Sequence, residues 1–522
     1  MPTHYKAFLV VISFAVVAFW FARPVFTKFM ADDEYIRRRN LWLMLTTSAF
    51  LIPNFWVHMA LAGLLVYRAA KKDSNPAALF IFLLLTIPPI EQPIPGFGLV
   101  NNLFPLHHIR LLCLVLITPV ALRIIKGEFN THDHQKKYNW MVPDVCLVAY
   151  SLLQVILYAP YSSITDTTRS ILLLGLDLLL PYFVLSRLCT TKERLIEVVA
   201  VFSLAATVLA PVAIFEMLKG WLLFDDLAAN WKVDTDVGGY LLRGDNVRAV
   251  VSSGNSIVLG NFFAVALGTW LYLVNKINKN QALVVSTIIV GGLISAFSRG
   301  PWVGAVVAVF VFFAVGPNPA ARLFKLIALS TLLACILMLS PYGSRVVDYL
   351  PFVGTVDAGN VSYRQAVNDR ALLIIGLNPF FGSPFFSFYM EDLRTGLGII
   401  DFLNVYLSIG MAYGLVTLGA FVLFFAAAMY RPLILIYRWK RTDHDTAILG
   451  AALVCALVGT LAIIYTASNY LSIPYIYTAL AGLAVAFSQL QTNMQAEEYK
   501  NIQQRSGSLR YGNGLKSSIR QG

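Results

Sequence analysis

The strongest candidates for functional residues in this chain are arginines on short polar segments between apolar stretches, because they could bind an anion. Arg243 and Arg248 precede the run Ser252–Asn255, which begins an apolar stretch, so guanidinium groups and the free amides of a helix start would face the same anion. Arg299 lies in a very short turn, where a charge between apolar segments is costly unless it is paired or used. The alternative for these residues is an arginine that snorkels to lipid headgroups.

A longer polar segment, residues 341–401, carries two more arginines. Its sequence predicts a helix from about residue 362 to Leu377, because Asn378-Pro379 disfavours helical backbone beyond that point. On this helix Arg364 would share one face with residues 367, 368 and 371, whereas Arg370 would lie on another face.

Asp401, at the end of this segment, is the candidate for a group that accepts a proton. On a continuous helix, Asp401, Asn404 and Ser408 would form one polar stripe. A desolvated position at the mouth of a helix bundle would raise the pKa of Asp401 toward neutrality. The alternative is that this carboxylate only caps the helix.

The composition indicates a polytopic helical membrane protein. Of the 522 residues, 58% are hydrophobic and 13% are charged, whereas about a quarter of the residues of a soluble domain are charged. Apolar runs of about 20 residues recur along the chain, and alternating strand patterns are absent. We therefore predict an all-α fold of about 14 transmembrane helices, with a long periplasmic loop between the eleventh and twelfth.

The predicted spans follow the apolar runs, and the short ones are compatible with tilted, broken or re-entrant segments. They are 7–22, 41–66, 77–90, 109–125, 141–160, 170–186, 195–218, 255–274, 282–297, 301–316, 323–340, 402–430, 447–467 and 471–490. The predicted regions are an N-terminal bundle (1–218), a catalytic region with periplasmic loops 219–254 and 341–401 (219–430), C-terminal helices (431–490) and a disordered cytoplasmic tail (491–522).

The net charge of +12 arises from basic residues that gather on alternate loops. Such loops face the cytoplasm, so we predict both termini to be cytoplasmic and the long loops to be periplasmic. Arg37-Arg38-Arg39 is the exception, because it would lie on the periplasmic side. The charge therefore requires no nucleic acid as a partner.

No metal or other cofactor is expected. The five cysteines show no metal-binding spacing. Asp234 and Asp236 imitate the metal-binding DxD of enzymes that use nucleotide sugars, but they fall on the predicted periplasmic side, away from those substrates. Glu91 and the pair His107-His108 are weaker candidates that could reach the same cavity as the arginines.

From Leu242 to Phe425 the chain resembles the O-antigen ligase/polymerase superfamily of bacterial inner-membrane glycosyltransferases. The resemblance is carried by short motifs in a fixed order: Arg248 through Asn261, Ser298-Arg299-Gly300-Pro301-Trp302-Val303-Gly304, Tyr363-Arg364, Asn378-Pro379-Phe380-Phe381-Gly382, Asn404-Val405-Tyr406-Leu407 and Tyr413-Gly414-Leu415. Ligases of this family commonly carry His-Asn-x-Tyr-Leu. Leu403 stands at the histidine position here, which favours a polymerase and leaves Asp401 as the nearest titratable group.

The resemblance implies that a glycan is transferred from an undecaprenyl-diphosphate carrier to an acceptor sugar hydroxyl at the periplasmic face, with inversion and without a metal. Fixed cations would stabilise the charge that develops on the diphosphate. The candidate catalytic residues are Asp401, Arg364 and Arg299. The candidates for substrate binding are Arg248, Arg243, Arg370, Asn404 and Tyr406.

The expected partners are the carrier-linked glycan, an acceptor saccharide and the lipid bilayer, with a flippase and a chain-length regulator as further candidates. Two alternatives within the family are an O-antigen ligase and a protein O-oligosaccharyltransferase. An alternative of another class is a flippase for the same lipid-linked glycan. A flippase needs polar residues deep in the spans, and Asp177, Glu197 and Glu216 are the ones available.

Overall fold

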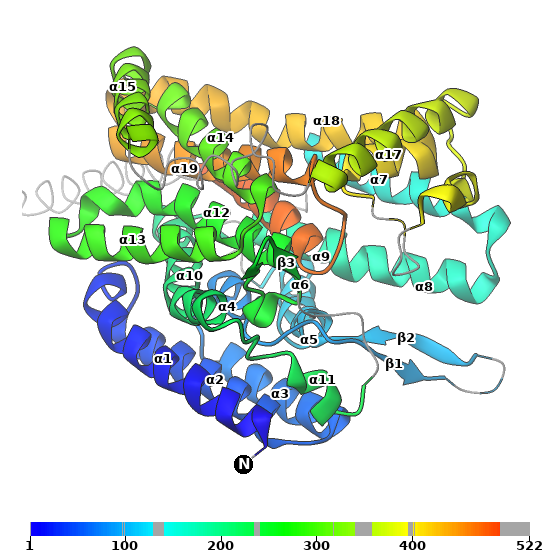
Figure 1. The fold of residues 1–522 in the computed structure, drawn as a ribbon, viewed down its shortest axis with the longest axis horizontal. Helices are drawn as coiled ribbons and strands as arrows, with labels where there is room; N and C mark the ends of the chain where they lie inside the picture. The colour runs from blue at the N-terminus through cyan, green and yellow to red at the C-terminus, as the bar shows by residue number, and fades with distance from the viewer. Residues whose placement is uncertain are drawn as a thin grey trace, which may run out of the picture.

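The computed structural model describes residues 2–96, 98, 100–128, 140–233, 241–316, 318–339, 358–394, 400 and 402–490. This part of the chain is built almost entirely of helices, with two small antiparallel hairpins (Figure 1). Ten of its helices are long and apolar enough to cross a membrane, and three shorter helices are also apolar. The prediction of an all-α polytopic membrane protein is therefore confirmed, whereas the number of spans stays a prediction.

The elements follow one another along the chain in this order. They are α1 (Thr3–Phe26), α2 (Asp32–Leu51), α3 (Phe55–Ala70), α4 (Pro76–Leu83), β1 (Gln92–Pro95), β2 (Asn102–Leu106), α5 (His108–Leu112), η1 (Cys113–Ile117), α6 (Thr118–Ile125), α7 (Val142–Tyr158), η2 (Ala159–Tyr161), α8 (Ile164–Leu174), η3 (Gly175–Leu179), α9 (Leu180–Leu188), α10 (Lys192–Lys219), α11 (Asp226–Asn230), β3 (Leu242–Arg243), β4 (Asn246–Val247), η4 (Val251–Ser253), α12 (Ser256–Leu273), η5 (Val274–Lys276), α13 (Lys279–Ser295), α14 (Arg299–Val315), α15 (Pro319–Leu339), α17 (Ala358–Leu377), η6 (Phe386–Leu393), α18 (Val405–Thr442), α19 (His444–Ile464) and the helix Ile473–Leu490.

The helix bundle has two distinct ends. At the first, Nζ of Lys192 and Nζ of Lys276 lie 3.1 and 2.6 Å from the carboxylate of Asp445, and we call it the lysine end. The opposite end carries α11, the β1–β2 hairpin and α17, toward the right-hand side of Figure 1, and we call it the loop end.

The predicted span 41–66 is wrong, because the chain reverses at residues 52–54 and forms the antiparallel pair α2 and α3. Oδ1 of Asn54 caps α3 by accepting the amide of Val57 at 3.1 Å. The fully buried Arg38 of α2 forms ion pairs of 2.7 Å with Asp73 and with Glu197. The three consecutive arginines of α2 therefore lie at the lysine end with the other basic residues, and the predicted exception disappears.

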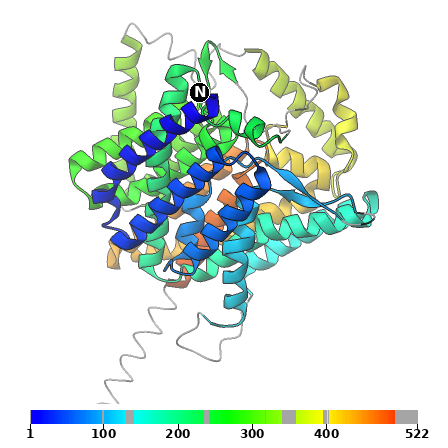
Figure 2. The same cartoon turned by 90° about the horizontal axis from the view of Figure 1, so that it is seen from below.

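The contact between α1 and α2 shows at which end of the bundle α1 begins. Arg23, in the last turn of α1, pairs with Asp32 of α2 at 2.7 Å, so the first turn of α1 points toward the loop end. Figures 1 and 2 show α1, α2 and α3 as one layer along a side of the bundle. The helix Ile473–Leu490 ends at the lysine end, where Gln489 donates to the carbonyl of Ser186 at 2.9 Å. These two helix ends lie at opposite ends of the bundle, and the side of the membrane on which each terminus lies stays a prediction.

The short predicted span 77–90 is a half-helix. Its helix α4 has eight residues, all of them buried, and a helix of that length rises only about 12 Å, which is less than half of the roughly 30 Å hydrocarbon core. Beyond its end, Nε2 of His108 donates to the carbonyl of Leu83 at 3.0 Å, and the Ser252 hydroxyl donates to the carbonyl of Leu85. Side chains from other helices thus satisfy carbonyls that a continuous helix would have bonded itself.

Glycines bring α14 and α19 together at the centre of the bundle. A Cβ added to Gly304 would lie 2.8 Å from the carbonyl oxygen of Gly459, and a Cβ added to Gly459 would lie 2.8 Å from that of Gly304. Small residues spaced in this way allow close approach of membrane helices. The packing fixes the first turn of α14, which begins with Arg299, against the end of α19.

We expect Gly304→Leu to lower the free energy of unfolding by about 1–3 kcal/mol, because a side chain there must push α14 away from α19. Val306→Leu is the matched control, because Val306 lies on the same helix with an exposed side chain. Thermal unfolding of the purified protein in detergent measures both. Equal unfolding midpoints for the two variants would show that this helix contact is loose.

A small second core holds the segment between α15 and α18. Val367, Ala371 and Ile374 of α17 pack against Met390 of η6 and Met411 of α18. We call the described residues 358–394 the loop module. The main hydrophobic core is separate from this one and extends from α1 to the helix Ile473–Leu490.

The loop module is anchored in a break of α18. At Gly414 the backbone leaves the helical conformation with a φ of 75°, and the amides of Leu415 and Val416 turn outward. The carbonyls of Pro379 and Phe380 accept these amides at 2.7 and 3.3 Å. Two motifs that lie more than thirty residues apart in the sequence, Asn378–Gly382 and Tyr413–Leu415, are therefore a turn and the helix break that receives it.

Candidate functional site

A cavity of about 90 Å³ lies between the loop module and the ends of two membrane helices. Three segments form its wall: one face of α17, the start of α18 and the residues that follow α19. The lining residues are Arg364, Val367, Asn368, Ala371, Phe402, Leu403, Asn404, Leu407, Met411, Tyr465 and Thr466. We call this space the Arg364 cavity.

The cavity contains the helix face that the sequence predicts. Arg364, Asn368 and Ala371 all line it, at the spacing of one side of a helix. Arg370 does not line it. Its guanidinium donates to Asp392 at 2.9 Å and to the carbonyl of Tyr389 at 2.7 Å, on the outer surface of the loop module. Arg370 is therefore removed from the set of residues that could hold a ligand in this cavity.

The start of α18 differs from the prediction. The helix begins at Val405, and Oδ1 of Asn404 caps it by accepting the amide of Leu407 at 3.2 Å. Because the backbone of Asn404 is extended, with a φ of −156°, the helical period does not continue back to residue 401. The polar stripe predicted for Asp401, Asn404 and Ser408 is therefore wrong. Asp401 itself lies outside the described residues.

Asn404 and Tyr406 have structural contacts. Asn404 lines the cavity while its side-chain oxygen caps α18. Tyr406 is not part of the lining, and its hydroxyl donates to the carbonyl of Leu461 in α19 at 2.9 Å. This bond ties the start of α18 to α19. The predicted role of Tyr406 in substrate binding has no support from its position.

Arg299 begins α14 next to the cavity wall. A Cβ added to the following residue, Gly300, would collide with Oγ1 of Thr466, and Thr466 lines the Arg364 cavity. Trp302 closes the same turn by donating Nε1 to the carbonyl of Leu293 at 3.0 Å. Arg299 and Arg364, 65 residues apart in the sequence, are thus brought to the same part of the loop end.

The loop with Arg243 and Arg248 joins this region through the backbone. Arg243 lies on the β3–β4 hairpin, and the amide of Ala249 donates to the carbonyl of Ser295 at 3.1 Å, four residues before Arg299. Val251 and Phe297 flank this junction with positive φ angles of 49° and 42°. Side chains of these types rarely adopt that conformation, so the surrounding contacts hold a strained backbone at the junction.

Glu216 of α10 holds the Arg248 loop in place through hydrogen bonds to its backbone. This carboxylate of α10 is fully buried and accepts the amides of Leu223, Val250 and Val251 at 2.9, 2.9 and 2.8 Å. Its depth in an apolar run makes Glu216 a candidate for a transport path when only the sequence is considered. Its contacts instead make it a positioning residue for the arginine loop, and no signal in the sequence pairs it with those amides.

We expect Glu216→Ala to lower the free energy of unfolding by at least about 2 kcal/mol, because three buried amides lose their acceptor. Glu193→Ala, an exposed change on the same helix, should cost less than about 0.5 kcal/mol. Chemical unfolding in detergent measures the stability, and hydrogen exchange of amides 248–251 reports on the loop. Unchanged exchange in Glu216→Ala would contradict the positioning role.

A second polar cluster, at the start of α5, includes an arginine that is not among the residues predicted from the sequence. The guanidinium of Arg110 lies 2.8 Å from Asp177 and 3.3 Å from Glu91, and the Tyr475 hydroxyl also donates to Asp177. The sequence feature that could have indicated this cluster is Arg110 at the start of an apolar stretch, with Glu91 before it. None of these residues lines the Arg364 cavity.

His107 and His108 are buried beside this cluster. His107 caps α5 and stacks edge-on against Tyr475, and His108 bonds to α4. Burial lowers the pKa of His107 well below its usual value, so its imidazole is neutral at pH 7. Their packing gives neither histidine a place in the Arg364 cavity. Asp234 and Asp236, the other polar pair singled out in the sequence, lie outside the described residues.

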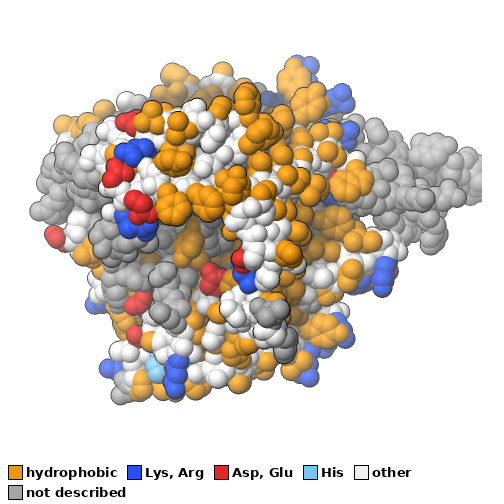
Figure 3. Space-filling model, turned by 90° about the vertical axis from the view of Figure 1, so that its right-hand side faces the viewer, with side chains coloured by type: hydrophobic (Ala, Val, Ile, Leu, Met, Phe, Trp, Pro, Cys, Tyr) orange, Lys and Arg blue, Asp and Glu red, His pale blue; other side chains and the backbone are white. Residues whose placement is uncertain are grey.

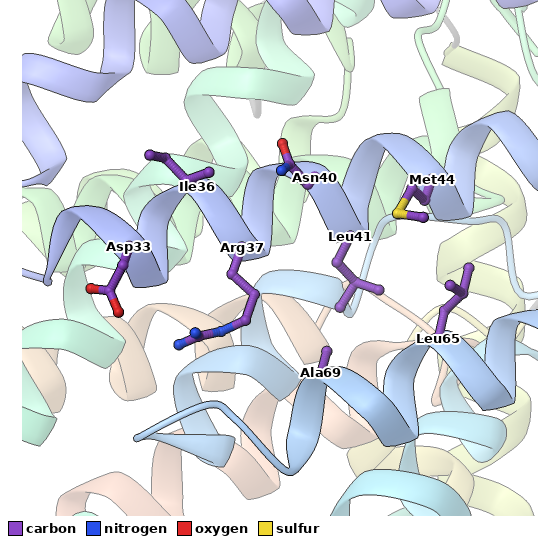
Figure 4. Close-up of a pocket in the computed structure, with 8 residues that line it drawn as sticks. All are labelled: Asp33, Ile36, Arg37, Asn40, Leu41, Met44, Leu65 and Ala69. Carbon is purple, nitrogen blue, oxygen red and sulfur yellow. The ribbon is translucent and has the colours of Figure 1, made fainter.

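A larger but open groove of about 440 Å³ lies near the lysine end between α2 and α3. Figure 4 shows Leu41 of α2 pointing toward Ala69 of α3, with Arg37 on the same side of α2. Arg37 forms an ion pair with Glu34. None of the predicted site residues lines this groove, so size alone does not select the functional site.

In comparisons with known proteins, no protein-family model matches the chain, and no curated protein is significantly similar to it in sequence.

Proposed function

We propose that this protein is a polysaccharide polymerase of the inner membrane, which transfers a glycan from an undecaprenyl-diphosphate carrier to the hydroxyl of an acceptor sugar. The observation that carries the proposal is that three arginine segments, distant in the sequence, lie near the cavity, which Arg364 itself lines. Arg364 lines the cavity, the segment of Arg299 packs against its wall at Thr466, and the loop of Arg248 is hydrogen-bonded to the chain just before Arg299.

The chemistry needs positive charge and one proton acceptor. The acceptor hydroxyl oxygen attacks the anomeric carbon, the bond from that carbon to the diphosphate oxygen breaks, and the diphosphate leaves with the bonding electrons. Guanidinium groups stabilise the charge that develops on it, and they hold phosphate oxygens with two donors at once. In this proposal Asp401 takes the proton of the hydroxyl, and Arg299, Arg364 and Arg248 hold the diphosphate.

The location of the site supports the same class of reaction. A carrier lipid presents its diphosphate at the membrane surface, and the Arg364 cavity lies where α18 and α19 reach the loop end. We propose that the loop end faces the periplasm and the lysine end faces the cytoplasm, in agreement with the distribution of basic residues. With this orientation the first turn of α1 lies at the periplasmic side.

A flippase is the weaker proposal. The carboxylates that would support it are engaged: Asp177 with Arg110, Glu197 with Arg38, and Glu216 with backbone amides. Asp177 and Glu197 thereby join separate helices, and Glu216 joins α10 to the loop of Arg248. A ligase and a protein O-oligosaccharyltransferase use the same leaving group, and only the acceptor distinguishes them from a polymerase.

Reconstitution tests the proposal. The purified protein is placed in vesicles with a synthetic polyprenyl-diphosphate repeat unit, and the products are separated by length. A ladder of longer carrier-linked chains, without any metal added, is the expected result. Transfer only to an added lipid or peptide acceptor would indicate a ligase or an oligosaccharyltransferase. Movement of intact substrate across the bilayer without a covalent product would overturn the proposal.

A further inference from the structure

The outer surface of α17 changes character along its length. Up to residue 369 its exposed positions include the polar residues Ser362, Gln365 and Asp369. Beyond residue 371 the exposed side chains are leucines, and Leu372, Leu373 and Leu377 are each more than 60% exposed. The opposite face is occupied throughout by the Arg364 cavity and the small core of the loop module. A water-soluble loop would not expose one apolar half of a helix in this way.

The apolar surface continues beyond the helix. Phe380 and Phe381, in the turn after α17, are 65% and 59% exposed. The backbone of this turn is bonded to Leu415 and Val416 of α18, whose side chains are also exposed. Farther along α18 the exposed residues are again apolar, Val422 and Leu423 among them. Figure 3 shows the loop end, where hydrophobic side chains cover much of the upper surface.

The position of the break in α18 at Gly414 indicates how deep this apolar surface lies relative to the hydrocarbon core. Gly414 precedes the exposed Arg431 of the same helix by 17 residues, which is about 25 Å along the axis. The hydrocarbon core of a bilayer is about 30 Å thick. If Arg431 marks one boundary of the core, the turn docked at Gly414 lies inside the opposite boundary.

We propose that residues 372–377 of α17 and the turn Asn378–Gly382 are inserted into the bilayer, so that the exposed leucines and phenylalanines contact lipid chains. The occupant is the bilayer itself, because this surface is continuous with the lipid-facing side of α18. The charged pairs of the module, Arg370 with Asp392 and Arg394 with Glu391, lie outside this apolar surface.

The insertion sets the depth of the Arg364 cavity. Arg364 precedes Leu372 by two turns of helix, so it lies about 12 Å farther out along α17. That offset brings the cavity to the headgroup layer, which adds roughly 5–8 Å of polar material on each side of the core. The inference itself rests on exposure and depth and holds whether or not the proposed reaction is right.

Spin labels at single cysteines test the insertion. Cys146 and Cys335, the two cysteines that are not fully buried, are first replaced by serine. A nitroxide is then attached at Leu373 or Phe381, with Leu423 of α18 as the lipid-facing reference and Glu391 as the reference for the charged surface. The protein is reconstituted in phospholipid vesicles, and the accessibility of each label to oxygen and to a water-soluble nickel chelate is measured.

At Leu373 and Phe381 we expect oxygen accessibility several-fold above that of the chelate, as at Leu423, and the reverse at Glu391. High chelate accessibility at Leu373 and Phe381 would overturn the proposal by placing them in water. Low accessibility to both probes would also overturn it, because a second copy or a protein partner would then cover the surface. Labelled variants are compared only if their unfolding midpoints match that of the unlabelled protein, and Leu377 replaces a position that fails.

Discussion

Replacing Arg364 by alanine is expected to lower the rate of glycan transfer about 10²–10³-fold, because one fixed cation at the developing diphosphate charge is lost. The expected change is in the rate at saturating substrate, while protein levels and the unfolding midpoint stay close to those of the unchanged protein. The assay is the formation of longer carrier-linked chains in reconstituted vesicles.

The helix itself supplies the matched control. Arg370→Ala removes the same side chain from the same helix, but from the outer face, where Arg370 pairs with Asp392. An exposed pair of this kind is worth at most about 1 kcal/mol of stability, and the variant should keep nearly full activity. Similar losses in both variants would mean that the charge of the module matters and the cavity does not.

Gly414→Ala is expected to separate the loop module from α18. Gly414 has a φ of 75°, and a Cβ there would collide with the carbonyl of Phe380, whose oxygen accepts the amide of Val416. Gly382, with a φ of 67°, faces the same contact from the other side, and a Cβ added to it would lie 2.5 Å from the amide nitrogen of Gly414. A positive φ of this kind costs an alanine about 1–3 kcal/mol before any collision. We therefore expect alanine at either position to cost more than about 2 kcal/mol of stability and most of the transfer activity.

Two other glycines on the same helices serve as controls. A Cβ added to Gly376 of α17 or to Gly419 of α18 meets nothing within 4 Å. Alanine at these positions should leave the unfolding midpoint unchanged or slightly raised, because alanine favours helix more than glycine does. Unfolding in detergent, followed by the transfer assay, compares the four variants. Gly414→Ala with the stability of Gly419→Ala would contradict the docking of the turn in the helix break.

The helices were predictable from the sequence because apolar runs of membrane length rarely occur outside transmembrane helices. The face of α17 that lines the cavity was also predictable, since the helical period places residues 364, 368 and 371 together. Short motifs mark the two segments with unusual backbone, Asn378–Gly382 and Tyr413–Leu415, although the helix break at Gly414 was not predicted. Their mutual contact was not predictable, because hydrogen bonds between a turn and a distant helix break leave no periodic pattern.

The failures have local causes. Residues 52–54 are Ile-Pro-Asn, and proline and asparagine are typical of turns. The apolar runs on both sides merge into one hydropathy peak, so the predicted span missed the reversal between α2 and α3. The N-cap of α18 is Asn404. Asn and Asp both cap helices well, so the sequence alone did not decide between Asn404 and Asp401. Arg370 and Tyr406 carry suitable chemical groups, but tertiary contacts with Asp392 and Leu461 engage them elsewhere. The role of Glu216 follows from three backbone amides, which its depth in the apolar run does not reveal.

The proposed function requires that arginines at the Arg364 cavity hold a diphosphate on a polyprenyl chain. The affinity of the purified protein for polyprenyl diphosphate and for polyprenyl monophosphate tests this requirement, measured by native mass spectrometry with the Arg364→Ala and Arg370→Ala variants alongside. We predict that the unchanged protein and Arg370→Ala bind the diphosphate at least about tenfold more tightly, which corresponds to about 1.4 kcal/mol, and that Arg364→Ala loses this preference. Equal affinity for the two lipids in the unchanged protein, or a preference that survives in Arg364→Ala, would show that the cavity does not hold the diphosphate.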